Sequence, residues 1–309
     1  MKRAAFTLIE LVMVIVILGI VSVISTNIIA HMYEGYLRSK SVNELQQKTE
    51  LVLDTIANRL KNRIKDAVFA RVSADPASIL PLSSPDVNDS YNMLEWIGYD
   101  YEGMLGEYNG TYSVPGWSGF VDLGDSSTDK TQIVTKGSHL SYAKNTIYAL
   151  SYGDLNLSDT GGDLPAIIFK CWSSLDPADY GLDPSTGDHN STLLVNKKSG
   201  SENILEFSEN TDDKEICEQY YMVWSAYAII PEGDDPNDFN LTLLYNYQPW
   251  MGEHYNDTGA TAPRKAVLAE HVSTFRFVEV GNTIRIKLCI QDANRSGANF
   301  GFCKERAIF

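Results

Sequence analysis

The sequence lacks the patterns that mark most enzymes and nucleic-acid-binding proteins. Its 25 Lys and Arg residues are outnumbered by 40 Asp and Glu residues, and a net charge of -15 disfavours binding to a phosphate backbone. No HExxH, GxSxG or phosphate-binding glycine motif is present, and the five histidines are scattered. We therefore expect no nucleic-acid partner, no cofactor and no enzymatic activity.

Cysteine is scarce, and none occurs in the first half of the chain. The four cysteines are Cys171, Cys217, Cys289 and Cys303. They include no CxxC pair, which disfavours a zinc site. An even number of cysteines beyond an apolar segment suggests disulfides in an oxidising compartment. Of the three pairings, we favour Cys289 with Cys303, which closes a short loop, and Cys171 with Cys217; four buried free thiols are the alternative.

One long hydrophobic run is present, near the N-terminus. Residues 6–30 are almost entirely apolar, with Glu10 the only charge, and they are long enough to cross a bilayer core of roughly 30 Å. A plain signal anchor leaves Glu10 unexplained, because a carboxylate in hydrocarbon is costly. A secretory signal peptide would need a cleavage site after the run, where "SVISTNIIAHMYEG" offers only a weak one. The third interpretation places cleavage before the run, between Ala5 and Phe6.

The basic leader 1–5 followed by "FTLIE" resembles the class III signal of type IV prepilins and type II secretion pseudopilins. The resemblance implies cleavage by a prepilin peptidase before Phe6, N-methylation of the new amine, and Glu10 as the acid at the fifth mature position. One departure is Ala5, where the family usually has Gly. The resemblance also implies partner pilin or pseudopilin subunits and a single-pass inner-membrane anchor. Lys2 and Arg3 would remain cytoplasmic, with the head in the periplasm.

The lone acid has a physical explanation in a filament. The Glu10 carboxylate of one subunit could pair with the N-terminal amine of a neighbour. Either charge alone is costly in apolar surroundings, and removing one partner of a buried pair costs roughly 3–5 kcal/mol. A single polar contact in an apolar seam also fixes register. We therefore expect Glu10 to act in assembly.

The N-terminal helix is expected to continue through residues 31–75 as an amphipathic segment. No proline precedes Pro76, and "SADP" at 73–76 ends the helical pattern. Apolar residues recur at mostly four-residue steps: Leu45, Val52, Ile56, Leu60, Ile64 and Val68. We expect one helix from about Phe6 to about Val72, with this stripe packed on a sheet of the same chain; a seam with a partner helix is the alternative.

The remaining residues, 76–309, are expected to form a soluble head. Residues 76–165 are rich in turn formers, which predicts short strands and long loops. "EQYYMVWSAYAII" and "FNLTLLYNY" predict a hairpin-like pair joined by a long acidic loop. Gly281 and Asn282, between two alternating runs, predict a two-residue turn, and residues 300–309 could add a strand. The fold expected is α+β and pilin-like: a transmembrane-then-amphipathic helix packed on an antiparallel sheet.

The acidic loop is the one candidate metal site. Its carboxylates are Glu232, Asp234, Asp235 and Asp238. Some type II secretion pseudopilins bind calcium in head loops, so the resemblance allows calcium here; a solvated acidic turn is the alternative.

The function expected is structural. A head of this size is hard to repeat in a tightly packed filament, which favours a minor subunit at the tip or an initiator. The C-terminal stretch "VSTFRFVEVGNTIRIKLCI" loosely resembles J-class pseudopilins and minor prepilins of mannose-sensitive haemagglutinin pili. The alternative is an adhesin or cargo-binding module displayed on the filament, with the aromatic loops at 91–120 as its surface. The sequence leaves pilus and secretion pseudopilus both open.

Overall fold

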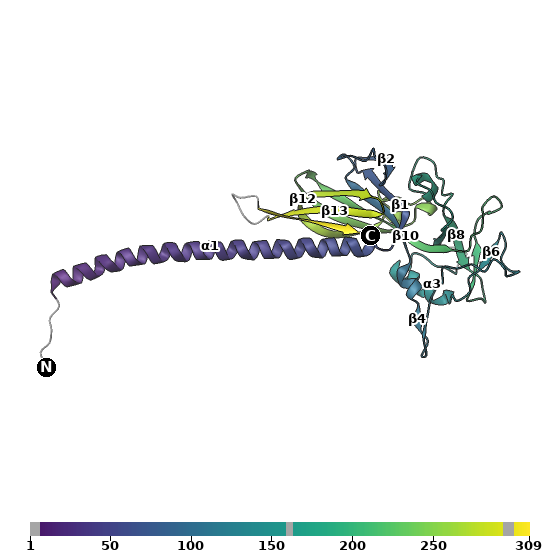
Figure 1. Ribbon diagram of the computed structural model, residues 1–309, viewed down its shortest axis with the longest axis horizontal. Helices are drawn as coiled ribbons and strands as arrows, with labels where there is room; N and C mark the ends of the chain where they lie inside the picture. Colours follow the sequence, from purple (N-terminus) through teal and green to yellow (C-terminus); the bar gives the residue numbers. More distant parts are fainter. Residues whose placement is uncertain (1–6, 159–162, 293–299) are drawn as a thin grey trace.

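The computed structural model of the chain describes residues 7–158, 163–292 and 300–309. One helix of 53 residues, α1 (Leu8–Leu60), runs through the long axis of the molecule. Its second half lies along a large antiparallel sheet, and its first half projects away from the head (Figure 1). This is the α+β, pilin-like layout expected from the sequence.

Within the described residues, twelve strands form one sheet. They are β1 (Arg63–Val72), β2 (Asp75–Pro81), β3 (Met93–Tyr99), β6 (Gln132–Val134), β7 (Ala166–Phe169), β8 (Leu193–Lys197), β9 (Ile204–Phe207), β10 (Tyr220–Asp235), β11 (Asp238–Tyr247), β12 (Arg264–Val280), β13 (Thr283–Gln291) and β14 (Gly301–Ile308). The main order is β14-β13-β12-β11-β10-β7-β8-β9-β6, and β3, β1 and β2 branch from β10. A separate hairpin is formed by β4 (Glu107–Tyr108) and β5 (Ser113–Val114). The shorter helices are α2 (Tyr101–Leu105) and α3 (Leu140–Leu150), and the 3₁₀ turns are η1 (Pro177–Tyr180), η2 (Pro249–Met251) and η3 (Gly259–Thr261).

The amphipathic half of α1 covers one face of β12, β13 and β14. Its buried residues are Leu45, Thr49, Val52, Leu53, Ile56, Ala57 and Leu60. The alternating residues of β13 pack in the same core: Ile284, Ile286, Leu288 and Ile290. Each fully buried aliphatic side chain contributes about 1.5–3 kcal/mol, so this interface holds helix and head together as one unit. The sequence predicted this packing correctly.

Polar contacts fix the helix on the sheet at its edge and at its end. Lys304 of β14 lies 2.7 Å from the Glu50 carboxylate, and Arg306 pairs with Asp54 one helical turn later. The buried guanidinium of Arg63 donates to three carbonyls, those of Leu60, Asn282 and Phe309. The last turn of α1 is thereby tied to the β12–β13 turn and to the end of β14.

The helix ends at Leu60, so the expectation that it continues to about Val72 is wrong. Residues 63–72 form β1, and residues 75–81 form β2. The reason is a run of five consecutive buried residues, 67–71. Val68 and Ala70 pack in the core beneath α1, whereas Ala67 and Phe69 pack in the core on the opposite face. Only a strand between two apolar layers buries successive residues in this way; a helix on one sheet cannot.

Two hairpins follow the sequence signals, with one difference. Val280 pairs with Thr283 around a two-residue turn, and Gly281 has a φ of 62°, as the Gly-Asn pair predicts. The β10–β11 hairpin is also present, but its ladder continues to the Asp235–Asp238 pair. The expectation of a long acidic loop is therefore wrong. Most of the acidic segment belongs to the two strands, with a register shift between Glu232 and Asp235.

The distal part of the head lies beyond the end of α1 and contains β6, β8, α3 and the projecting β4 hairpin (Figure 1). Its core is formed around α3 and two buried aromatic residues, Trp117 and Tyr220. The short strands β4 to β6 confirm the expectation for residues 76–165. The sequence did not predict the 11-residue helix α3.

A buried ion pair joins three strands in the middle of the sheet. The guanidinium of Arg71 donates to the Glu95 carboxylate through Nε at 2.9 Å and Nη2 at 2.7 Å. Its other donors reach the carbonyls of Pro76 and Leu182. The second oxygen of Glu95 accepts the Tyr247 hydroxyl at 2.8 Å. Arg71 and Glu95 are each 1% exposed, so this network is fully desolvated and nevertheless well paired.

Candidate functional site

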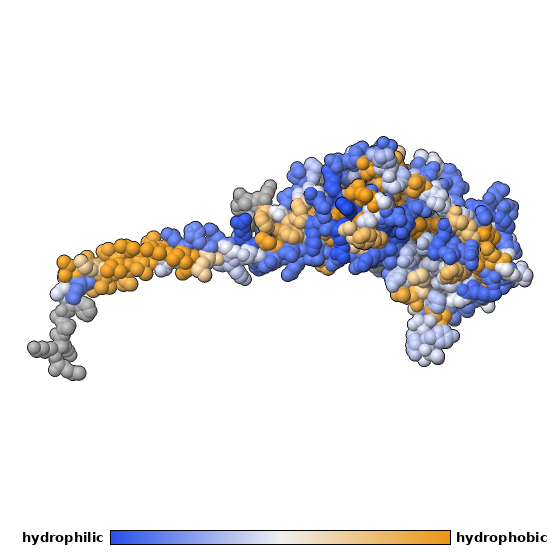
Figure 2. Space-filling model, viewed as in Figure 1, coloured by the Kyte–Doolittle hydropathy of each residue, from blue (hydrophilic) through white to orange (hydrophobic). Residues whose placement is uncertain are grey.

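The first half of α1 is a fully exposed apolar surface. The most hydrophobic stretch of this helix has no buried residue, and the helix is long and apolar enough to cross a membrane. Figure 2 shows a hydrophobic rod in this half, followed by a more polar stretch of the helix before the head. From Leu8 to Ala30 the rod is roughly 34 Å long, which matches a bilayer core of about 30 Å. Soluble proteins rarely expose an apolar patch of this size unless a membrane or a partner covers it.

Glu10 closes the first turn of this helix. Its carboxylate accepts the Thr7 amide at 3.0 Å and the Thr7 hydroxyl at 2.9 Å, while the Glu10 amide donates to the Thr7 hydroxyl at 3.4 Å. This is a capping box, in which two orphan donors of the helix terminus are satisfied reciprocally. The T-x-x-E spacing in "FTLIE" is its sequence signal. In a single chain, Glu10 therefore has a local partner, which partly offsets the cost of placing it in an apolar segment.

The other two residues expected at this site, Ala5 and Phe6, lie outside the described residues. Thr7, the first described residue, has an extended backbone with a ψ of 149°. Thr7 would be the second residue of the chain after the expected cleavage, so the capping box lies close to the expected new N-terminus.

Both disulfides have the pairing that the sequence analysis favoured. Cys289 of β13 is bonded to Cys303 of β14, directly across the two strands. Cys171, just after β7, is bonded to Cys217, just before β10. Each bond joins neighbouring parts of the head, so both act as covalent staples of the sheet.

The four carboxylates of the acidic segment are dispersed rather than gathered. Glu232 lies 2.7 Å from Lys265 and accepts the Thr242 hydroxyl at 2.8 Å. These two partners hold the pKa of Glu232 below its usual value against the opposing effect of burial. The expected ligands at the hairpin tip, Asp234, Asp235 and Asp238, are exposed, and Asp238 pairs with His271 at 3.0 Å. Among the described residues, no group of three or more acidic, His or Cys side chains is placed to hold a metal.

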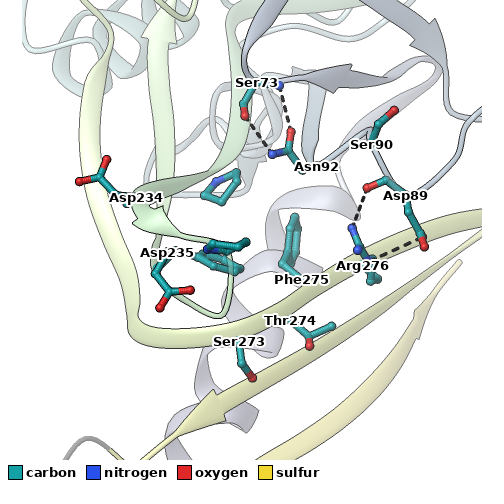
Figure 3. Close-up of a pocket in the computed structure, with 14 residues that line it drawn as sticks. Ser73, Asp89, Ser90, Asn92, Asp234, Asp235, Ser273, Thr274, Phe275 and Arg276 are labelled. Carbon is teal, nitrogen blue, oxygen red and sulfur yellow. Dashed lines mark hydrogen bonds and ion pairs between the residues drawn. The ribbon is translucent and has the colours of Figure 1, made fainter.

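A hollow of about 430 Å³ lies between this hairpin tip, β12 and the loop before β3. Phe275 lies in its centre, and the Asp234 carboxylate points away from it (Figure 3). Arg276 donates to the Asp89 carbonyl at 2.9 Å, and its Nε lies 3.7 Å from the Asp89 carboxylate. On the opposite wall, the side-chain amide of Asn92 exchanges two hydrogen bonds with Ser73. Arg276 and Asn92 thus already have partners within the wall of the hollow, and these contacts give no sign of a bound ligand.

The aromatic loops at 91–120 divide into a buried part and an exposed part. Trp96 and Trp117 are fully buried and belong to the core. Tyr108 and Tyr112, on either side of the β4–β5 turn, are 68% and 64% exposed. Phe120 is also exposed, at 52%, but Tyr108 and Tyr112 lie on the hairpin that projects from the head (Figure 1), where a partner could contact both rings.

Comparison with known proteins gives one match. Residues 1–26 match a family model described as the prokaryotic N-terminal methylation motif. No curated protein and no solved structure matches the chain. The matched segment contains the basic leader, Glu10 and the start of the exposed apolar rod, and it indicates a type IV prepilin- or pseudopilin-like protein.

Proposed function

We propose that this prepilin-like protein is a minor structural subunit of a type IV pilus or a type II secretion pseudopilus. The observation that carries the proposal is the division of α1 into two halves. One face of the second half is buried on the sheet, whereas the first half is apolar and exposed and lies largely within the matched methylation motif, residues 1–26. Such a rod can exchange lipid for equally apolar neighbouring helices without refolding the head.

Processing would precede assembly. Cleavage between Ala5 and Phe6 would remove Lys2 and Arg3 and create a positive amine, which is then methylated. Before cleavage, those two basic residues favour a cytoplasmic leader and therefore a periplasmic head. A periplasmic head is consistent with its two disulfides, because that compartment is oxidising.

Glu10 would then fix the position of each subunit's helix relative to its neighbour in the filament. Among the described residues of the single chain, its carboxylate accepts hydrogen bonds from the Thr7 amide and hydroxyl only, and a carboxylate can accept about four hydrogen bonds. The methylated amine of a neighbouring subunit could therefore approach Glu10 without breaking the cap. Charge-assisted hydrogen bonds in an apolar seam are strong and position-specific, which suits a registration contact.

The shape of the head supports a minor role. The distal lobe extends past the end of α1, and the β4–β5 hairpin projects to the side (Figure 1). Subunits that repeat closely along a filament must stack their heads at the helical spacing, so a projecting lobe is best accommodated where no further subunit follows. We therefore propose a position at the tip.

The test compares Glu10→Ala with Thr7→Ala in cells that assemble the filament. Both variants lose the capping hydroxyl–carboxylate contact, but only Glu10→Ala loses the charge. We expect both to insert in the membrane, and only Glu10→Ala to disappear from sheared filament fractions. Normal incorporation of Glu10→Ala would refute the pairing. Equal loss of both variants would show that Glu10 acts only as a helix cap.

A second candidate function is a filament-displayed adhesin or cargo-binding module. The exposed Tyr108 and Tyr112 favour it, because tyrosines on a projecting hairpin supply contact area at low entropic cost. The double variant Tyr108→Ser/Tyr112→Ser should then lose adhesion or cargo capture while still entering filaments. Exposed Tyr148 on α3 offers a matched control as Tyr148→Ser. Unchanged adhesion and secretion in the double variant would reject this function.

A further inference from the structure

A pocket rich in hydrogen-bond donors lies where α1 ends and β3 leads into α2. It has a volume of about 490 Å³. Arg59 and Lys61 line it from the end of α1, Tyr99 and Tyr101 from the junction of β3 and α2, and Tyr227 from β10. Concave sites that combine aromatic rings with a few polar side chains are the usual form of small-ligand sites.

The two cations of this pocket lack a carboxylate partner. The Arg59 guanidinium lies 5.7 Å from the centre of the Tyr227 ring, and the Lys61 ammonium lies 3.5 Å from the Asn58 side-chain oxygen. Glu102 also lines the pocket, but neither cation forms an ion pair with it or with another carboxylate of the described residues. Cations near the C-terminus of a helix complement the helix dipole, and this leaves their N–H groups free to bind an anion. The pocket is therefore locally positive in a chain whose net charge is -15.

The amide side chains of the pocket present donors as well. Lys61 can only donate, so the oxygen of Asn58 must face it, which leaves the Asn58 NH₂ group unused. The Tyr99 hydroxyl donates to the Asn62 oxygen at 3.4 Å and leaves the Asn62 NH₂ group in the same position. Neither NH₂ group has a protein acceptor in the part of the chain that the structure describes. Both amides thus add N–H donors to those of the two cations.

Tyrosine rings form the less polar side of the pocket. Tyr101 is 37% exposed and meets the Tyr99 ring edge to face, with ring centres 6.4 Å apart. Tyr99 in turn stacks on Tyr221 at 5.4 Å. A Cβ atom on Gly98 would lie 2.9 Å from the Tyr227 ring, so the glycine lets this ring pack directly against the backbone of β3. These contacts fix the rings before a ligand arrives, which lowers the entropic cost of binding.

We propose that this pocket binds an aromatic carboxylate, with the carboxylate held by Arg59 and Lys61 and the ring packed against Tyr101. A guanidinium and a carboxylate are both planar and can form two parallel hydrogen bonds. Because Glu102 also lines the pocket, a ligand with a single negative charge fits better than a polyanion. The carboxylate can belong to a free aromatic acid or to the C-terminal aromatic residue of a partner protein. The inference does not depend on the proposed role in a filament.

The test is a ligand-observed NMR titration of the full-length protein in a non-ionic detergent at neutral pH, referenced to detergent micelles alone. The probes are phenylacetate, acetate, which lacks the ring, and phenylacetamide, which lacks the charge. We expect saturable binding of phenylacetate and at least about tenfold weaker binding of the other two. N-acetyl-glycyl-phenylalanine separates the two sources. Tighter binding of this peptide assigns the site to a protein C-terminus, and tighter binding of phenylacetate assigns it to a small acid.

Variants connect the binding to this pocket. Arg59→Gln keeps an N–H donor but removes the charge, and it should weaken phenylacetate at least about tenfold. Lys61→Gln, at an exposed position, serves if Arg59→Gln does not fold. Lys48→Gln removes an exposed cation of the same helix outside the pocket and should bind like the wild type. The proposal is overturned if phenylacetate does not saturate, if acetate or phenylacetamide binds equally well, or if both pocket variants bind like the Lys48→Gln control.

Discussion

The buried Arg71–Glu95 pair gives the sharpest test of how the head is held together. Replacing Arg71 with Ala removes the cation beside the Glu95 carboxylate, which is 1% exposed in the wild type, and leaves the Tyr247 hydroxyl as its one remaining side-chain donor among the described residues. It also leaves the carbonyls of Pro76 and Leu182 without this donor. Removing one partner of a buried ion pair costs roughly 3–5 kcal/mol. For a folded unit of this size, that loss corresponds to a fall in melting temperature of roughly 6–20 °C.

The measurement is thermal unfolding of the full-length protein in detergent, followed by tryptophan fluorescence. Lys287→Ala is the matched control, because Lys287 forms an exposed pair with Glu305 at 3.8 Å. Such surface pairs contribute about 0–1 kcal/mol, so the control should melt close to the wild type. The double variant Arg71→Met/Glu95→Met should recover part of the loss, because it leaves no unpaired charge. An Arg71→Ala protein that melts with the control would refute the reasoning.

Three further predictions concern the covalent staples, a buried acid and the helix interface. Replacing Cys289 and Cys303 with Ser opens a disulfide loop of sequence separation 14 and should lower the free energy of unfolding by about 3 kcal/mol. Replacing Cys171 and Cys217, separated by 46 residues, should lower it by about 1 kcal/mol more, because a longer loop is opened. The reverse order of stabilities in urea unfolding would contradict this loop-entropy explanation. Burial raises the pKa of Asp100 from 3.8 to about 7, so the folded state holds a proton that the unfolded state lacks between those values. The Asp100 contribution to stability should therefore fall as the pH rises through this window and stay level above it. Asp100→Asn should make the fall shallower without abolishing it, because burial also raises the pKa of Glu253 to about 7; an unchanged pH slope of the unfolding free energy would refute this. Leu53→Ala in the helix–sheet core should destabilise the head by about 2–5 kcal/mol, whereas the exposed Leu51→Ala should change it little, and equal unfolding midpoints would contradict the packing of α1 on the sheet.

Periodicity predicted the parts of the fold in which one face is buried. The alternation at 284–290 places apolar residues on the helix side of β13, and the steps from Leu45 to Leu60 mark the matching stripe of α1. The pattern failed at Ile64 and Val68, which continue the helical spacing but lie in a strand buried on both faces. Such a strand has no amphipathic signature, so only the presence of a second apolar layer distinguishes it from a helix.

The candidate sites also differ in how far the sequence alone reveals them. Glu10 stands out in the sequence because it is one charge in an apolar run, and the T-x-x-E spacing even encodes its cap. The aromatic loops at 91–120 carry no such signal for exposure. Trp96 and Trp117 are buried, whereas Tyr108 and Tyr112 are exposed, and only the tertiary structure distinguishes the two pairs.

Intact-mass analysis of the membrane-extracted protein tests the central claim most directly. The protein should be taken from cells that contain an active prepilin peptidase. A subunit destined for a filament should give a chain that begins at Phe6 and carries one N-terminal methyl group. A chain that still begins at Met1 would contradict the account, because the exposed rod would then be a permanent membrane anchor rather than an assembly helix.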